Sequence, residues 1–342
     1  MKLPAELDEH LVGLLRSPPR VSPHVRSDPG AVLERAEAHG LAAVTLDALA
    51  SAGVELPPAL QSVTGRRATA RALDHAAHLD ALRAIDAAFA AAGLDAVVLK
   101  GSAFAERYYA VPSGRATSDV DLMVAEADLD RAALALAPLG YAPESGAEEE
   151  RFRREHHHLH LQSAAGPPLE LHFHAYRGFG SVLRSEPLIA RRARFAELPR
   201  GAVGVLSPPD ELVYLAAHAA AHRFIRLGWL YDLRLLVEHM SVEELEIAAG
   251  RARAAGYARL LSFTAQLLHD VLGVAQDRLE PLGRLDRVRA RLVDRVVGEP
   301  PSPVRRSATR FVYSAALCDT LPSAARYAVG ASVGRARGLF ER

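Results

Sequence analysis

Apolar residues recur at helical spacing through the first 92 residues of the chain. The pattern begins with four leucines, Leu7, Leu11, Leu14 and Leu15. After a proline-rich break it continues through residues 31–50 and 58–92, and Gly93 follows where a helix would end on a left-handed residue. The spacing predicts an N-terminal helical region over residues 1–92.

Shorter segments of mixed periodicity follow. The pattern predicts strands and helices that alternate: a strand at 95–100, a helix at 102–109, a strand at 119–124, a helix at 126–139, and a hairpin of 152–162 with 169–174. The hairpin would turn through residues 163–168, whose Gly and Pro are typical of turns. We therefore expect an α/β core over residues 93–204.

From residue 205 onward the spacing is helical again. Ser207 is followed by two prolines and Asp210, an arrangement that caps and opens a helix. Further helices are predicted at 228–239, 242–255, 257–272, 281–297 and 303–337. The predicted fold is α+β: a small mixed β-sheet core flanked by an N-terminal helical region and a C-terminal helical domain over 205–342.

Composition narrows the classes of protein this chain can be. The 342 residues hold 41 basic and 41 acidic side chains, so no net charge favours nucleic acid or a membrane surface. Cys318 is the only cysteine, which excludes an internal disulfide and fits a reducing compartment. No apolar run approaches the roughly 20 residues of a membrane span. We expect a cytoplasmic protein with no membrane partner.

The most informative chemistry lies between residues 100 and 121. A strand runs into Lys100, Gly101 and Ser102, and the next strand presents Asp119 and Asp121 on one face, because strand side chains alternate. Paired carboxylates supply the hard oxygen ligands of Mg²⁺, and the turn offers backbone N–H groups to phosphate. The alternative is a solvated strand edge that carries two acids.

Lysine usage adds weight to this interpretation. Only Lys2 and Lys100 are lysines among the 41 basic residues. A compact ammonium group on a flexible stem suits a triphosphate, so Lys100 is a candidate phosphate ligand.

A third carboxylate is expected to join the aspartates. Glu170 lies in a strictly alternating segment, 169–174, and shares a face with His172 and His174. If this strand lies beside 119–124, three acids converge, and only a cation would neutralise them. Two Mg²⁺ ions could then activate an acceptor hydroxyl and steady the leaving pyrophosphate.

These residues resemble a known family. The run VVLKGSAFAERYYAVPSGRATSDVDLMV (97–124), together with LELHFH (169–174) and HAAAHRFIRLGWLYDLRLL (218–236), resembles the bacterial "uncharacterised nucleotidyltransferase" family of the polymerase-β-like superfamily. The resemblance covers roughly residues 75–240.

The resemblance implies a role for each matching residue. Gly101 and Ser102 would contact phosphates, and Lys100 and Arg115 would be their cationic partners. Asp119, Asp121 and Glu170 would bind Mg²⁺ (or Mn²⁺), with Glu170 also the base toward the acceptor. The implied activity is transfer of a nucleoside monophosphate from an NTP, expected to be ATP, to a hydroxyl of a small molecule or protein. The alternative is a catalytically silent nucleotide- or partner-binding protein, antitoxin-like or regulatory, on the same fold.

Histidines suggest two further features. Those at 156–158, 160, 172 and 174 allow a competing interpretation, a zinc hydrolase built on the hairpin, although a hydrated polar face is also possible. His218 and His222 lie four residues apart on one helical face, but the Glu of a metalloprotease motif is absent. We interpret them, with Asp232 and His172, as possible substrate-binding groups; a buried hydrogen-bonded pair is the alternative.

Overall fold

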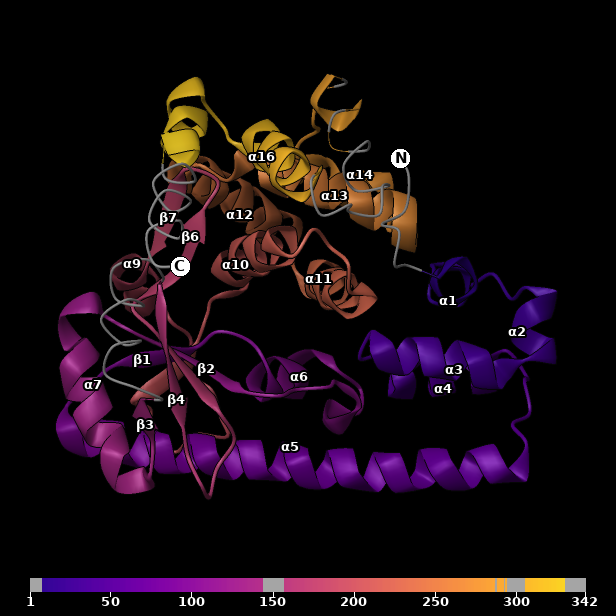
Figure 1. Cartoon of the computed structure of the whole chain (residues 1–342), viewed down its shortest axis with the longest axis horizontal. Helices are drawn as coiled ribbons and strands as arrows, with labels where there is room; N and C mark the ends of the chain where they lie inside the picture. The colour runs from indigo at the N-terminus through magenta and orange to yellow at the C-terminus, as the bar shows by residue number, and fades with distance from the viewer. Residues whose placement is uncertain (1–7, 144–156, 287, 292, 294–304, 330–342) are drawn as a thin grey trace. The chain divides into compact units, whose positions relative to one another are not determined.

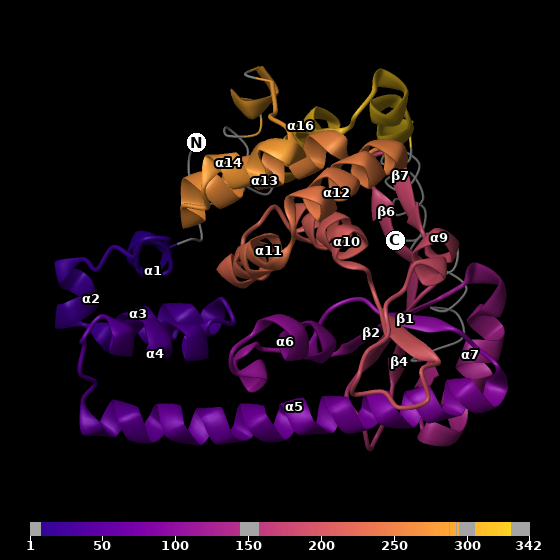
Figure 2. The ribbon, with the colours of Figure 1, turned by 180° about the vertical axis from the view of Figure 1, so that it is seen from behind.

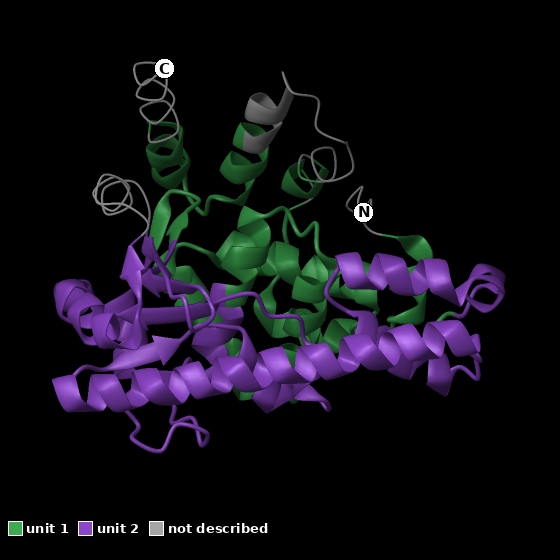
Figure 3. Ribbon diagram, turned by 60° about the horizontal axis from the view of Figure 1, so that its bottom comes forward, with its two compact units in different colours: residues 1–20, 177–182, 215–342 green, residues 21–176, 183–214 purple. Residues whose placement is uncertain are grey.

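The computed structural model describes residues 8–143, 157–286, 288–291, 293 and 305–329. Within them the chain divides into two compact units (Figure 3). We call residues 21–176 and 183–214 the sheet unit, and residues 1–20, 177–182 and 215–342 the helical unit. None of the described helices is long and apolar enough to cross a membrane.

A six-stranded mixed sheet forms the centre of the sheet unit (Figure 1). Its strand order is β3-β4-β5-β2-β1-β8. The strands are β1 Ala96–Val98, β2 Val120–Val124, β3 Ala142–Pro143, β4 His158–Gln162, β5 Leu169–His172 and β8 Val203–Val205. β2 is parallel to β5 and antiparallel to β1, whereas β4 and β5 form the antiparallel hairpin expected from the sequence. The predicted α+β class is confirmed.

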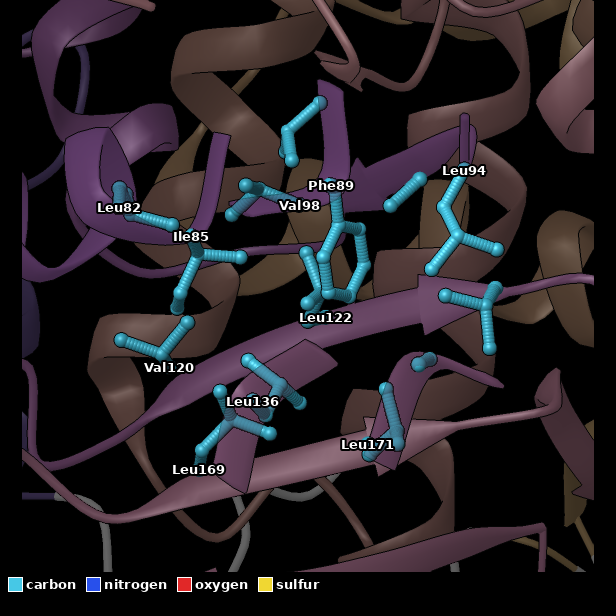
Figure 4. Close-up of a cluster of buried hydrophobic side chains, with 14 of the residues drawn as sticks. Leu82, Ile85, Phe89, Leu94, Val98, Val120, Leu122, Leu136, Leu169 and Leu171 are labelled. Carbon is cyan, nitrogen blue, oxygen red and sulfur yellow. The ribbon is translucent and has the colours of Figure 1, made fainter. Parts of the chain in front are cut away.

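Helices α5 (Pro58–Ala92) and α7 (Leu129–Leu136) cover one face of this sheet (Figure 4). Alternate residues of the central strands, such as Val120, Leu122 and Leu171, point at Ile85 and Phe89 of α5 and are fully or almost fully buried. Because strand side chains alternate, the residues between them point to the opposite face. The polar residues of β2 and β5 are therefore held on the face away from this core.

The buried residues of α5 all lie between His78 and Phe89, in its C-terminal half. The helix ends at Gly93 in the left-handed conformation, as the sequence predicts. Its N-terminal half lies beside the short helices α3 and α4, and Arg71 of α5 pairs with Glu37 of α3 at 3.4 Å (Figures 1 and 2). The remaining helices of the sheet unit are α2 Pro23–Ser27, α3 Pro29–Ala38, α4 Ala42–Ser51, α6 Ser102–Tyr108 and α9 Ser185–Ala190.

The helical unit contains most of the predicted C-terminal helices. They are α11 Leu227–His239, α12 Val242–Ala255, α13 Ala258–Leu272, α14 Gln276–Leu279 and α16 Arg305–Leu317, with α1 Glu9–Leu14 from the N-terminus. α10 (Pro208–Ala221) begins in the sheet unit and ends in the helical unit, and the hairpin of β6 (His174–Gly178) and β7 (Ser181–Arg184) crosses the same boundary. The three-region division expected from the sequence stays a prediction.

Several predicted elements need correction. The helix expected over 31–50 is two helices, because the chain turns at Gly40, whose φ is +73°. The helix expected over 126–139 is α-helical only at Leu129–Leu136, with 3₁₀ turns on either side. The helix expected over 303–337 is interrupted at residues 318–320. Residues 283–286 of the predicted helix 281–297 are not helical, and residues 152–156, 287, 292 and 294–297 lie outside the described residues.

One correction concerns the acidic strand. β5 ends at His172, and His174 belongs to β6, which pairs with β7 instead of the large sheet. The backbone N–H groups of Phe173 and His174 both donate to the carbonyl of His157, so the chain leaves the large sheet there. His174 lies 3.6 Å from Glu126. It therefore does not continue the strand face of Glu170 and His172.

Candidate active site

The turn between β1 and α6 depends on a glycine. Gly101 has φ +76° and ψ −138°, a conformation that side-chain-bearing residues rarely adopt. A Cβ there would come within 3.2 Å of the Thr117 side chain. α6 then begins at Ser102, whose hydroxyl oxygen is buried and has no hydrogen-bond partner among the described residues. A buried hydroxyl without a partner at such a turn is suited to an anionic ligand.

The two aspartates and Glu170 lie on adjacent strands. Asp119 directly precedes β2, Asp121 is its second residue, and Asp121 is the register partner of Glu170 on the parallel strand β5. Cross-strand partners share a face of the sheet. The Asp121 side chain is fully buried, whereas those of Asp119 and Glu170 are 26% and 23% exposed. The structure thus places Asp121 and Glu170 opposite each other. Asp119 lies immediately before the first residue of β2.

Lys100 lies between the two aspartates. Its Nζ is 2.6 Å from Oδ2 of Asp121 and 3.7 Å from Oδ1 of Asp119. Burial alone would lower the pKa of Lys100, but the charges of Asp121 and Asp119 reverse this, so the pKa is raised. Lys100 is therefore a charged member of the cluster.

His172 links Asp121 to Glu170. Its Nε2 lies 3.3 Å from Oδ1 of Asp121 and 3.4 Å from Oε2 of Glu170. Burial opposes the imidazolium, but hydrogen bonds to these two carboxylates outweigh it and raise the pKa of His172. The imidazole is thus part of the carboxylate cluster.

The three carboxylates have different protonation tendencies. Burial would raise the pKa of Asp121, yet Lys100 and His172 hold that pKa well below its ordinary value. Burial likewise opposes ionisation of Glu170, whose pKa is nevertheless lowered, chiefly by the hydrogen bond from His172. Burial and then the charge of Asp121 raise the pKa of Asp119. Asp121 and Glu170 are therefore held as anions.

Comparison with known families identifies the class of protein. The profile of the "Uncharacterised nucleotidyltransferase" family matches residues 26–273, which include the whole carboxylate cluster. The chain belongs to this family. No curated protein matches the sequence.

The solved structures similar to this nucleotidyltransferase family member include the antibiotic-resistance factor ANT(2'')-Ia. The two chains are 13% identical, with a TM-score of 0.38, and the match covers 52% of this chain and 91% of the other. A similarity at this level does not carry the activity of that protein over to this one.

Arg115 lies in the loop between α6 and β2 of this nucleotidyltransferase. Its guanidinium donates to the hydroxyl of Thr117 at 3.2 Å and lies 5.7 Å from the ring centroid of Phe104. Its predicted role toward phosphate stays a prediction.

Residues of α10 that the sequence did not single out also belong to this region of the nucleotidyltransferase. Tyr214 is buried, and burial followed by the charges of Asp121 and Glu170 raises its pKa well above the ordinary value. One turn earlier, Glu211 is fully buried, pairs with Arg107 and accepts from the hydroxyl of Tyr108 at 3.2 Å. Because α10 also carries Asp210 and His218, the spacing of Glu211 and Tyr214 did not distinguish them in the sequence.

His218 and His222 lie in the helical unit. The ring centroids of His218 and His222 are 5.1 Å apart, and both rings pack on Trp229, at 5.4 Å and 4.9 Å. Asp232 is buried on the same helix as Trp229. These contacts describe a histidine pair packed on an aromatic ring, and a role toward substrate stays a prediction.

A pocket of about 710 Å³ opens on the α5 side of the sheet unit. Its walls include Ala77 and His78 of α5, Ser118 before β2, Tyr141, and the 165–168 turn. Ser118 donates to Oδ1 of Asp119 at 3.2 Å. The pocket is on the core side of the sheet, whereas the carboxylate cluster is on the opposite face.

The residues of the cluster suit a magnesium–triphosphate group. The carboxylates of Asp119, Asp121 and Glu170 are oxygen donors, which Mg²⁺ prefers. A Cβ at Gly101 would be strained at φ +76° and would press on the Thr117 side chain, and the Ser102 hydroxyl lacks a partner among the described residues. The carboxylates and the residues predicted to contact phosphate therefore lie side by side.

Proposed function

We propose that this chain catalyses transfer of a nucleoside monophosphate from a nucleoside triphosphate, ATP in the first instance, to an acceptor hydroxyl. One observation carries the proposal. Asp121 and Glu170 are register partners on adjacent parallel strands, with Asp119 beside them, next to the Lys100-Gly101-Ser102 turn. Family membership supports nucleotidyl transfer in general.

Asp119, Asp121 and Glu170 would hold Mg²⁺ (or Mn²⁺) in this proposal. The bound metal would neutralise charge on the triphosphate and on the departing pyrophosphate. Because the pKa values of Asp121 and Glu170 are lowered, both side chains are already anionic near neutral pH. A carboxylate with a lowered pKa is a weak base, so Glu170 is proposed first as a ligand and only second as the base.

The other residues would bind and orient the triphosphate. Lys100 is paired with the aspartates, and its flexible stem would allow the ammonium to turn from them toward phosphate. Gly101 lets the backbone approach phosphate closely, and the Ser102 hydroxyl is available as a donor. His172 keeps Asp121 and Glu170 in place by contacting both.

The proposed reaction is an in-line displacement at the α-phosphorus. The acceptor oxygen forms a bond to the α-phosphorus, while the bond from that phosphorus to the bridging oxygen breaks. Pyrophosphate leaves with the bonding electron pair, and the hydroxyl proton passes to a carboxylate of the site or to water. The acceptor is an unidentified small molecule or protein.

Parallel incubations with each triphosphate test the proposal. Protein is mixed with NTP labelled at the α-phosphate, Mg²⁺ or Mn²⁺, and a bacterial lysate divided into small-molecule and protein fractions. We expect the α-label to move to an acceptor while unlabelled pyrophosphate is released, and Asp121→Asn to stop both. Triphosphate binding without label transfer in any fraction would instead identify a silent nucleotide-binding protein.

A further inference from the structure

A patch of four polar side chains lies on the strands next to the proposed transfer site. In the antiparallel pair β4–β5, His160 is the register partner of Glu170, and His158 is the register partner of His172. Residues two apart on a strand share a face, so the four form the corners of one patch. Its position on the sheet continues the row that starts at Asp121.

The ligand atoms of this patch lie close together. Nε2 of His158 is 3.3 Å from Nε2 of His160, and Oε1 of Glu170 is 3.6 Å from Nδ1 of His160 and 4.0 Å from Nε2 of His158. Ligands that bind one metal at about 2.1 Å in tetrahedral geometry lie roughly 3.4 Å from each other. With one ligand atom from each residue, His158, His160 and Glu170 lie within 4.8 Å of one another, so their side chains would draw closer together around one metal ion.

We propose that His158, His160 and Glu170 form a binding site for a divalent transition-metal ion of the zinc and cobalt class. Imidazole nitrogen is a preferred ligand of these ions, whereas Mg²⁺ prefers oxygen. The site is argued from side-chain placement alone and does not depend on the proposed transfer reaction.

Other combinations in the patch are less suited to such an ion. His157, His158 and His172 are also close enough to share a metal, but this set supplies three neutral imidazoles and no carboxylate. Asp121, Glu170 and His172 form a third group, in which Lys100 already pairs with Asp121. The set with two imidazoles and one carboxylate balances ligand type and charge best.

Glu170 connects this site to the transfer site. Its Oε1 faces His158 and His160, while its Oε2 faces His172, which in turn contacts Asp121. The two oxygens of one carboxylate can therefore serve two neighbouring positions. Its carboxylate would bridge an oxygen-rich position at the aspartates and a nitrogen-rich position at the histidines.

Metal binding by the purified full-length chain tests the proposal. Metal-free protein is titrated with Co²⁺ while its visible absorption is recorded, and Zn²⁺ content is measured after equilibrium dialysis. We expect about one tightly bound equivalent, retained in millimolar Mg²⁺. His158→Ala and His160→Ala should each weaken Co²⁺ binding by at least tenfold.

Two variants serve as controls. His75 pairs with Glu106 at 2.6 Å on other elements of the sheet unit, so His75→Ala removes a histidine–carboxylate pair without touching the patch. Asp119→Ala removes a proposed Mg²⁺ ligand only. Both variants should still bind about one equivalent of Co²⁺. A folded wild type that takes up no Co²⁺, loses it to Mg²⁺, or binds it equally well after His160→Ala overturns the proposal.

Discussion

The ammonium group of Lys100 lies 2.6 Å from a carboxylate oxygen of Asp121, whose side chain is fully buried. The lysine thus supplies positive charge at one carboxylate oxygen of this aspartate, and His172 contacts the other oxygen at 3.3 Å. A cation bound by Asp121 would compete with this ion pair, so Lys100 would be released toward the triphosphate as the aspartates take up metal.

Lys100→Arg tests this exchange of partners. A guanidinium keeps the charge, but it is larger and planar, whereas the Lys100 side chain is only 15% exposed. We expect kcat/KM for label transfer to fall at least tenfold. The reverse exchange at the surface, Arg83→Lys on α5, should leave kcat/KM unchanged, because Arg83 is 43% exposed and pairs with the exposed acids Asp80 and Glu197. Full turnover and full triphosphate affinity in Lys100→Arg would remove Lys100 from the site.

Asp121→Asn should abolish transfer and also weaken the fold. The substitution keeps the shape but removes the charge that both Lys100 and His172 contact. Breaking a buried ion pair on one side costs about 3–5 kcal/mol, because the other charge stays buried without a partner. Urea unfolding of the metal-free protein measures that loss, and calorimetry with Mg²⁺–ATP measures binding. Wild-type turnover by this variant would contradict the metal-ligand role.

Asp86→Asn is the control for Asp121→Asn, because Asp86 is a buried carboxylate that stabilises the fold and lies outside the proposed site. Asp86 on α5 is fully buried and accepts hydrogen bonds from the backbone N–H groups of Arg200, Gly201 and Val203, at 2.8, 3.3 and 2.9 Å. An amide accepts more weakly and adds a donor, so we expect a loss of about 1–3 kcal/mol in the free energy of unfolding. Triphosphate affinity of the folded variant should be unchanged.

Gly101→Ala should impair triphosphate binding more than an equivalent change elsewhere. Alanine at φ +76° is strained, and its Cβ would press on Thr117 at 3.2 Å. Gly93→Ala is the control, since Gly93 also has a positive φ, +61°, but open space around the added Cβ. Both variants should lose about 1 kcal/mol or more of stability, and only Gly101→Ala should lower the affinity for ATP, measured by calorimetry. Equal affinities would show that close backbone approach at Gly101 is not used.

Local sequence patterns predicted the parts of the fold that local interactions determine. α5 runs from Pro58 to the predicted stop at Gly93, and the β4–β5 hairpin is joined by the predicted turn. Strand parity placed Glu170 on the face of Asp121, because alternation along β2 and β5 is a local property.

Features set by distant parts of the chain could not be predicted in this way. His174 was expected to share the face of Glu170, but the chain leaves the sheet at Phe173, whose N–H donates to the carbonyl of His157. Tyr214 reaches the surroundings of the carboxylates only through the position of α10, which no spacing in the sequence reveals. Lys100 was expected to contact phosphate, and its ion pair with Asp121 depends on how the 100–102 turn folds back on β2.

The thiol of Cys318 should make stability fall at alkaline pH. It is buried in the helical unit, with Sγ 3.1 Å from the carbonyl oxygen of Phe179 and 3.2 Å from that of Ser314. Burial raises the pKa of Cys318 from 9.0 to about 11. Between pH 9.0 and about 11 the thiol is protonated in the native state but deprotonated in the unfolded state. The free energy of unfolding therefore decreases as pH rises from 9.0 toward about 11, and is unaffected by this group at lower pH.

Comparison with Cys318→Ala isolates this contribution from other groups that titrate at the same pH. Urea unfolding at pH 8 and at pH 10.5 should show wild type losing more stability than the variant over that interval. A thiol-specific reagent at pH 8 should modify native wild type only as fast as the helical unit opens, and unfolded protein at once, because the native thiol is buried and protonated. Rapid modification of the native protein, or an identical pH dependence in Cys318→Ala, would show that the thiol is accessible and that its pKa is not raised.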